Sequence, residues 1–458
     1  MIKNGQSREG RDIIFEYWGS SELIYRLSQE KHAGRKLFWF SQDDFSDSWF
    51  KSQVNTSIEN LGKRYTPELN IELEIAKYFD AISKNDIYRE AVKHKFHELI
   101  LSINKAVSSL NSLGVDNEIK EIKQSISDIE HQFTLSQNKE LSLIDINSLE
   151  RSIDTIKSSL ANCDDQTNKN EEKKESHDYI KHHINEAWGA IYDFIDFIHS
   201  PILKLSNNPF ALLSGPAGIG KSHLLADIAL NRINSNKSCI LLLGQHFTSE
   251  EPPWTQILRS LLRLDFNEKQ LLGALDAKAE AQGERLLFII DAINEGRGKY
   301  FWYDHINGFV SAFKNYPWIG LILSIRSSYK ELLIPKEILT NEKMIILRHN
   351  GFESIEYQAS SFFFAQYGIE QPSVPLLNPE FSNPLFLKLF CEGLNRSNLT
   401  KIPKGYGGIS SVIEFFIDSI NEKLSHPNYF DFPSNQNLII GLWTNSRSPD
   451  SLGENQGY

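Results

Sequence analysis

Cysteine is scarce in this chain of 458 residues. The three cysteines, Cys163, Cys239 and Cys391, lie far apart and form no C-x-x-C pair. This usage argues against a disulfide framework and against a zinc site built on paired cysteines. The chain also lacks an apolar run long enough to span a membrane, and polar sequence rather than a signal peptide follows Met1. We therefore expect a cytoplasmic protein that makes no contact with a membrane.

Positive charge is also in short supply. The chain has 48 lysines and arginines against 59 aspartates and glutamates, which leaves a formal net charge of −11. Such a balance argues against a broad surface for nucleic acid. The hydrophobic content of 40% is ordinary for a soluble globular protein, and the length suggests about three domains.

One segment carries a strong chemical signal. An apolar strand leads into G-x-x-x-x-G-K-S at 215–222, and a helical pattern follows. The glycines let successive N–H groups line one concavity for a phosphate chain, with the positive end of the helix behind it. Lys221 is expected to reach the β- and γ-phosphates, and the Ser222 hydroxyl to ligate Mg²⁺. The residues predicted to bind the nucleotide here are Gly215, Pro216, Ala217, Gly218, Ile219, Gly220, Lys221, Ser222 and His223.

A second segment supplies acidic groups. The apolar strand 286–290 ends at Asp291, where a P-loop enzyme places its second Mg²⁺ contact. A general base is needed to orient the attacking water, and Ala292 leaves no carboxylate directly after Asp291. Glu295 is the nearest candidate for this base. The alternative is that Glu295 only caps the loop.

The predicted strand 321–325 is followed by Arg326. In a sheet of this kind its carboxyl end lies beside the first strand, so Arg326 can point at the γ-phosphate. A cation there stabilises charge on the transferred phosphoryl group and responds to its presence. The alternative is an arginine paired with a surface carboxylate.

Five short apolar runs alternate with helical patterns, which is typical of a parallel sheet covered on both faces. These predicted strands are 210–214, 239–243, 286–290, 321–325 and 344–347. The predicted fold class is α/β: a P-loop NTPase with an ASCE-type five-stranded parallel sheet and a helical lid.

The rest of the chain is divided by its patterns. Apolar residues at alternating steps of three and four, such as those at 119–133 and 149–160, indicate antiparallel helices or an oligomeric coiled coil, and the shortness of each seam favours packing within the chain. Residues 164–176 contain no apolar side chain and predict a solvated linker. The first predicted unit, at 1–87, is a small mixed α/β unit with strands at 13–18 and 36–40. A helical arm at 88–162, a linker at 163–178 and the NTPase domain at 179–350 follow. The helical lid at 351–425 has predicted helices at 353–367, 384–394 and 411–424, and the irregular tail is 426–458.

The motifs GPAGIGKSHLL, LLLGQHF, FIIDAINEG, LSIRSSY and NPLFLKLFCEGL occur in this order. The series resembles the signalling STAND ATPases, and most closely the bacterial antiviral branch called AVAST. The resemblance implies ATP and Mg²⁺ as ligands, with Lys221, Ser222, Asp291 and Arg326 in their usual roles. It also implies that Pro384 belongs to the motif at which the lid touches the nucleotide base. It further implies a homo-oligomer in the active state and a phage protein as trigger, recognised through a sensor that is not evident in this sequence.

Three functions remain open at this point. The first is a slowly hydrolysing ATP switch that oligomerises in its ATP state and acts in anti-phage defence. The second is a remodelling or motor ATPase of the AAA+ type. The third is a scaffold that binds ATP without hydrolysing it.

Overall fold

The computed structural model describes residues 5–6, 12–13, 45–111, 114–137, 141–169, 174–340, 343–371, 379–396 and 398–402. It divides the chain into two compact units, one of residues 1–216 and 221–349 and the other of residues 217–220 and 350–458. Near the start, β1 (Gly5–Gln6) pairs in antiparallel fashion with β2 (Asp12–Ile13). The strand predicted at 36–40, the helix predicted at 411–424 and the predicted tail lie outside the described residues.

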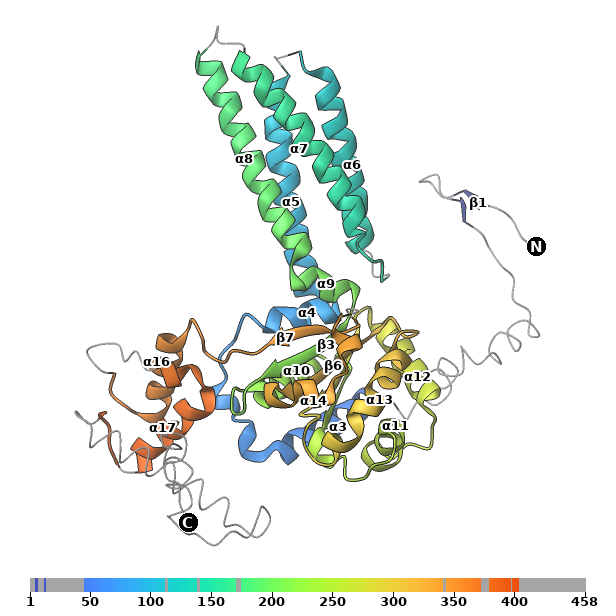
Figure 1. Cartoon of the computed structure of the whole chain (residues 1–458), viewed down its shortest axis with the longest axis vertical. Helices are drawn as coiled ribbons and strands as arrows, with labels where there is room; N and C mark the ends of the chain where they lie inside the picture. Colours follow the sequence, from blue (N-terminus) through green and yellow to red (C-terminus); the bar gives the residue numbers. More distant parts are fainter. Residues whose placement is uncertain are drawn as a thin grey trace, which may run out of the picture. The chain divides into compact units, whose positions relative to one another are not determined.

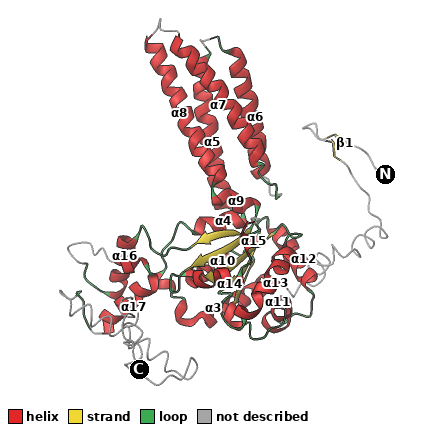
Figure 2. Ribbon diagram, viewed as in Figure 1, coloured by secondary structure: helices red, strands yellow, loops and turns green. Residues whose placement is uncertain are grey.

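A five-stranded parallel sheet lies at the centre of the first unit (Figure 2). Its order is β4-β5-β6-β3-β7, so β6 lies between the strand that precedes the P-loop and the strand that ends at Asp291. The prediction of a five-stranded parallel sheet is confirmed. The strands are β3 (Phe210–Gly215), β4 (Cys239–Leu243), β5 (Leu286–Asp291), β6 (Ile319–Arg326) and β7 (Ile345–Arg348).

Both faces of the sheet are buried over β3, β4, β5 and most of β6, where the strands are apolar at almost every position, whereas the edge strand β7 is partly exposed. In β3, Ala211 and Leu213 point into one hydrophobic core, while Phe210 and Leu212 point into another. The first core is lined by α10 and the helical arm, and the second by α12 and α13. The helices around the sheet are α3 (Asp47–Leu61), α10 (Lys221–Asn234), α11 (Pro253–Thr255), α12 (Glu268–Gln282), α13 (Gly298–Phe313), α14 (Lys330–Leu333) and α15 (Lys336–Thr340).

Helix α3 covers the free edge of β4. The Gln53 amide donates to the Leu241 carbonyl at 2.7 Å and accepts from the Leu241 N–H at 3.1 Å, as a neighbouring strand would. Ser57 donates a further hydrogen bond to the same carbonyl. Residues 45–87 therefore pack onto the sheet, and the prediction of a separate N-terminal unit is wrong for this part of it.

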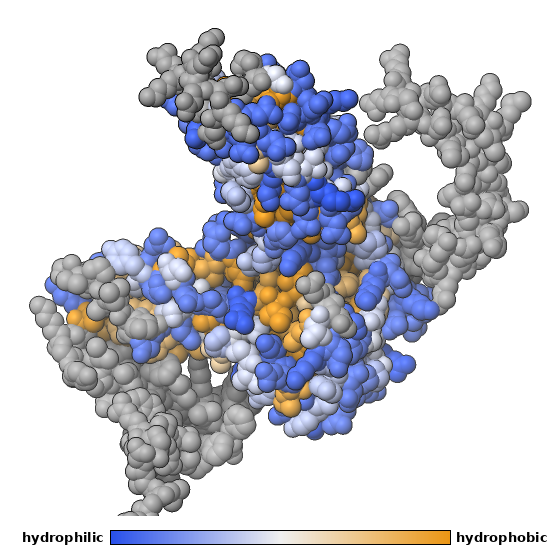
Figure 3. All heavy atoms as spheres, turned by 45° about the horizontal axis from the view of Figure 1, so that its top comes forward, coloured by the Kyte–Doolittle hydropathy of each residue, from blue (hydrophilic) through white to orange (hydrophobic). Residues whose placement is uncertain are grey.

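Four long helices form the arm that rises from the sheet in Figure 1. They are α5 (Asp86–Leu110), α6 (Asp116–Gln137), α7 (Ile146–Lys169) and α8 (Lys174–His199). Helix α5 packs against α6 and α8, and α7 packs against the same two, so the apolar seams close within one chain. The visible surface of the arm is mostly hydrophilic (Figure 3). Helix α8 belongs to this bundle, so the prediction that the NTPase domain begins at residue 179 is wrong for this helix.

The solvated linker predicted at 163–178 is wrong for most of its length. Helix α7 continues to Lys169 and α8 begins at Lys174. Cys163 and Thr167 are buried in the bundle, and the Thr167 hydroxyl bonds the Cys163 carbonyl. Lysine, glutamate and glutamine have high helix propensity, so a polar run can continue a helix whose inner face is already packed.

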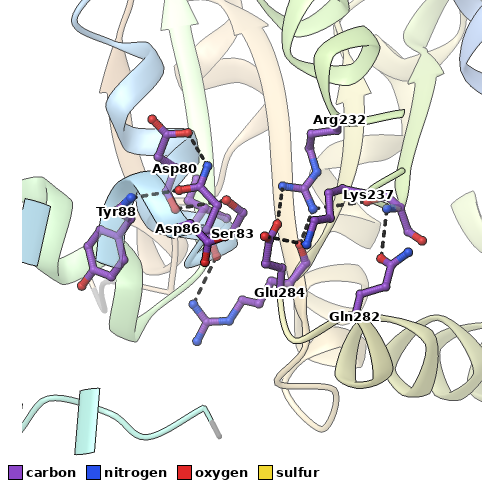
Figure 4. Close-up of polar contacts among 12 residues, drawn as sticks. Asp80, Ser83, Asp86, Tyr88, Arg232, Lys237, Gln282 and Glu284 are labelled. Atoms are coloured by element: carbon purple, nitrogen blue, oxygen red, sulfur yellow. Dashed lines mark hydrogen bonds and ion pairs between the residues drawn. The ribbon is translucent and has the colours of Figure 1, made fainter. Parts of the chain in front are cut away.

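The arm joins the sheet through α4 (Ala76–Ser83), α9 (Pro201–Asn207) and the segment before β5. The guanidinium of Arg285 is fully buried and donates to the carbonyls of Ile82, Ser206 and Pro317. It thereby satisfies carbonyl groups at the ends of two helices. Beside it, Glu284 lies between Lys237 and Arg232 (Figure 4).

The described part of the second unit is helical. Helix α16 (Glu356–Tyr367) packs against α17 (Pro384–Arg396), and the short turn η7 (Pro379–Ser382) contributes Phe381 between them. Among all described helices of the chain, none combines the length and the apolar character that a membrane span needs.

Candidate functional site

The P-loop connects the carboxyl end of β3 to the first turn of α10. Gly218 and Gly220 have φ values of 75° and 99°, which side chains disfavour, so glycine is required at both turns. The Lys221 ammonium is buried and donates to the carbonyls of Gly215 and Pro216, both at 2.7 Å. Burial lowers its pKa to about 8, although the nearby Asp291 carboxylate opposes this shift. The lysine is therefore held inside the loop by backbone carbonyls.

Asp291 lies at the end of β5 and is 2% exposed. The Ser324 hydroxyl, on the neighbouring strand β6, donates to its carboxylate at 2.5 Å. Ser222 also hydrogen bonds to Asp291, and these two bonds oppose the rise in the pKa of Asp291 that burial causes. A carboxylate and a serine hydroxyl thus meet where the sheet joins α10, which is a set of oxygen donors suited to Mg²⁺.

The loop after β5 is fixed to the ends of the neighbouring strands. Ala292 adopts a left-handed φ of 54°, and its N–H donates to the Ser324 hydroxyl at 2.7 Å. A side chain on Gly244 would collide with the Ala292 carbonyl, so the loop after β4 packs directly against this turn. The Asn294 side chain accepts from the Arg326 N–H at 3.0 Å. These contacts place Glu295 beside the end of β6.

Glu295 lies between two arginines. Arg326 Nη2 is 3.0 Å from its Oε1, and Arg64 Nη1 is 2.9 Å from its Oε2. Arg64 also donates through Nη2 to the Gln245 amide oxygen at 2.9 Å. Each carboxylate oxygen of Glu295 therefore accepts a hydrogen bond from an arginine.

The remaining predicted nucleotide-binding residues lie in two places. His223, in the first turn of α10, bonds the Thr66 carbonyl through Nε2 at 3.0 Å. Pro384 stands at the start of α17, where the Asn383 side chain caps the helix. Within the second unit, the Leu385 N–H donates to the Gly218 carbonyl at 3.2 Å. The tip of the P-loop thus packs against the start of this helix.

Sequence reasoning missed three residues of the site. Ser324 had a usable signal, because a serine inside a buried strand needs a partner. His349 follows β7, and burial lowers its pKa to about 4, with Lys221 and His223 adding to the effect. Arg64 had no local signal, since Glu295 lies 231 positions away.

No protein-family model and no curated protein matches this sequence. Among solved structures, a Walker-type ATPase of Pyrococcus abyssi matches with 15% sequence identity and a TM-score of 0.32. The match covers 53% of this chain and 72% of that protein. At this level of similarity, the functional argument rests on the residues of the chain itself.

Proposed function

We propose that this chain binds ATP together with Mg²⁺ and hydrolyses it. The proposal is carried by one observation: Lys221, Ser222, Asp291 and Arg326 meet at the carboxyl edge of a single parallel sheet, beside a P-loop. Ligands of open α/β sheets bind at this edge. Backbone N–H groups and Lys221 bind the phosphates, and Arg326 stabilises charge on the γ-phosphate.

Ser222 and Asp291 would hold Mg²⁺. The buried Asp291 carboxylate lies against two hydroxyl groups, so a divalent cation would compensate the cost of its burial. When bound, Mg²⁺ neutralises charge on the phosphate oxygens. Ser324 keeps the Asp291 carboxylate in place by a hydrogen bond from β6.

Glu295 orients the attacking water and accepts its proton in this proposal. Both of its oxygens accept hydrogen bonds from arginines, so a water molecule competes with two guanidinium groups for this carboxylate. This competition supports slow hydrolysis, which suits a switch better than a motor. The apolar seams of the four-helix bundle pack against one another within the chain, so assembly in the ATP state would use another surface.

The resemblance of the motif series to that of STAND ATPases supports the narrower part of the proposal. In this narrower proposal, the chain is a STAND-type switch of a bacterial anti-phage system, and a phage protein acts as the trigger. Pro384 belongs to the helical lid that responds to the nucleotide.

The test combines nucleotide binding, turnover and assembly. Lys221→Ala should abolish binding of a non-hydrolysable ATP analogue and any assembly with it, measured by calorimetry and by chromatography with light scattering. Lys77→Ala is the control, because it removes the same charge from an exposed ion pair with Glu74. A turnover well above about 1 s⁻¹ would favour the remodelling ATPase. Binding of ATP without hydrolysis would support the scaffold that binds ATP without hydrolysing it. Assembly that is unchanged in Lys221→Ala would rule out the ATP-dependent switch.

A further inference from the structure

Arg64 reaches the site from a distant part of the sequence. It ends the short 3₁₀ turn η2 (Gly62–Arg64), which directly follows α3. Its guanidinium bonds Glu295 and Gln245 at the same time, so its two terminal nitrogens are held in one orientation. The Arg64 side chain is 42% exposed and that of Glu295 is 18% exposed. The pair thus lies at an accessible rim of the site.

The backbone around Arg64 is attached to the helix that follows the P-loop. His223 bonds the Thr66 carbonyl at 3.0 Å, and its ring lies 4.9 Å from the Tyr65 ring. The Tyr65 hydroxyl contacts the Asp227 carboxylate of α10 at 3.4 Å. Because α3 is also bonded to β4, the η2 turn is anchored on both sides. Arg64 is therefore held beside α10 while its side chain can exchange partners.

We propose, on the basis of the ATP-binding function above, that Arg64 recognises the terminal phosphate of a nucleoside triphosphate. Glu295 holds Arg64 in its observed position, and the terminal phosphate replaces this carboxylate. The guanidinium favours the exchange, because a phosphate carries more negative charge and more acceptor oxygens than one carboxylate. Gln245 keeps its bond to the second guanidinium nitrogen and positions the arginine.

This assignment has two consequences. A diphosphate lacks the terminal group, so it leaves Arg64 on Glu295. A triphosphate draws Arg64 away and frees one Glu295 oxygen to orient water. Arg64 thereby discriminates triphosphate from diphosphate and links the segment 45–66 to the state of the nucleotide.

The experiment compares the affinities of the full chain for a non-hydrolysable ATP analogue and for ADP, both with Mg²⁺. Arg64→Ala should lower the affinity for the ATP analogue about tenfold, as expected for the loss of a charged hydrogen bond. The affinity for ADP should change less than twofold. Arg64→Lys keeps the positive charge but cannot form bidentate hydrogen bonds, so it should lower the affinity for the ATP analogue by an intermediate factor. Arg297→Ala is the control, because Arg297 is two positions from Glu295 but pairs with the exposed Glu250.

Each outcome decides a different point. An unchanged ratio of the two affinities in Arg64→Ala would overturn this inference and leave the proposed function standing. An equal loss for both nucleotides also leaves this ratio unchanged, and it would show that Arg64 only supports the fold. If the wild-type chain bound neither nucleotide, the proposed function would fail and this inference with it.

Discussion

A single hydroxyl group, that of Ser324, connects the ends of two neighbouring strands. It donates to the Asp291 carboxylate and accepts from the Ala292 N–H, so it holds both the acid and the turn that follows. Around Asp291 the site depends on polar groups that are buried and paired with one another. If one group of such a pair is removed, the other stays buried without a hydrogen bond. The resulting loss of folding free energy is larger than the net contribution of the hydrogen bond itself.

Ser324→Ala should therefore weaken the site without removing any group expected to touch the nucleotide. It leaves the Ala292 N–H without a partner and raises the cost of an ionised Asp291, so stability should fall by about 1–3 kcal/mol. Affinity for ATP with Mg²⁺ should fall about fivefold, the equivalent of one net hydrogen bond. Thermal melting and calorimetric titration measure these two effects. Ser327→Ala, at an exposed position, is the control, and equal behaviour of the two variants would contradict the assigned role.

At the scale of elements, the edge of the sheet is closed by a helix. Strand β4 pairs with β5 on one side only, and an unpaired edge attracts other strands. The Gln53 side chain imitates a strand by both donating to and accepting from Leu241. This contact also sets the position of η2 and hence of Arg64. A strand-like side chain thus connects the sheet edge to the nucleotide site.

Gln53→Ala should loosen α3 from the sheet. Two hydrogen bonds are lost, and we expect a loss of about 1–2 kcal/mol and faster hydrogen exchange at the Leu241 amide. Exchange followed by mass spectrometry would detect the change in the segment 239–243. Gln124→Ala, on the exposed side of α6, should leave that segment unaffected. Unchanged exchange in Gln53→Ala would mean that apolar packing alone holds the helix.

At the scale of the first unit, one hydrophobic core runs from the arm to a face of the sheet. It includes residues of all four arm helices and continues through α4, α9 and α10. Polar groups cross the same junction, and Lys84 is one of them: its ammonium is buried and donates to the Ser142 carbonyl at 2.8 Å. Burial lowers its pKa to about 7, with Arg285 and Arg89 adding to the effect.

This buried lysine predicts a pH dependence of stability. The unfolded chain holds the proton up to about pH 10.5, whereas the folded chain releases it above about pH 7. The penalty for burying Lys84 is therefore complete below pH 7 and shrinks as the pH rises, by at most about 1.4 kcal/mol per unit. Lys84→Met should melt above the wild type at pH 6.5, and the difference should narrow towards pH 9.5.

Thermal melting at several pH values measures this trend. Lys77→Met serves as the control, because Lys77 lies on α4, the helix that ends just before Lys84, but is exposed and pairs with Glu74. A difference between Lys84→Met and the wild type that stays constant with pH would contradict the lowered pKa of Lys84.

Local patterns determined much of this protein. The five buried strands, the P-loop and Asp291 at a strand end are each encoded within a few neighbouring residues, because burial and backbone torsion act locally. Tertiary structure alone decided which groups meet. It placed α8 in the arm, continued helices through the predicted linker and attached residues 45–87 to the sheet. It also brought Arg64 to Glu295 across 231 positions, a pairing that depends on how α3 packs against β4 and on no pattern near either residue.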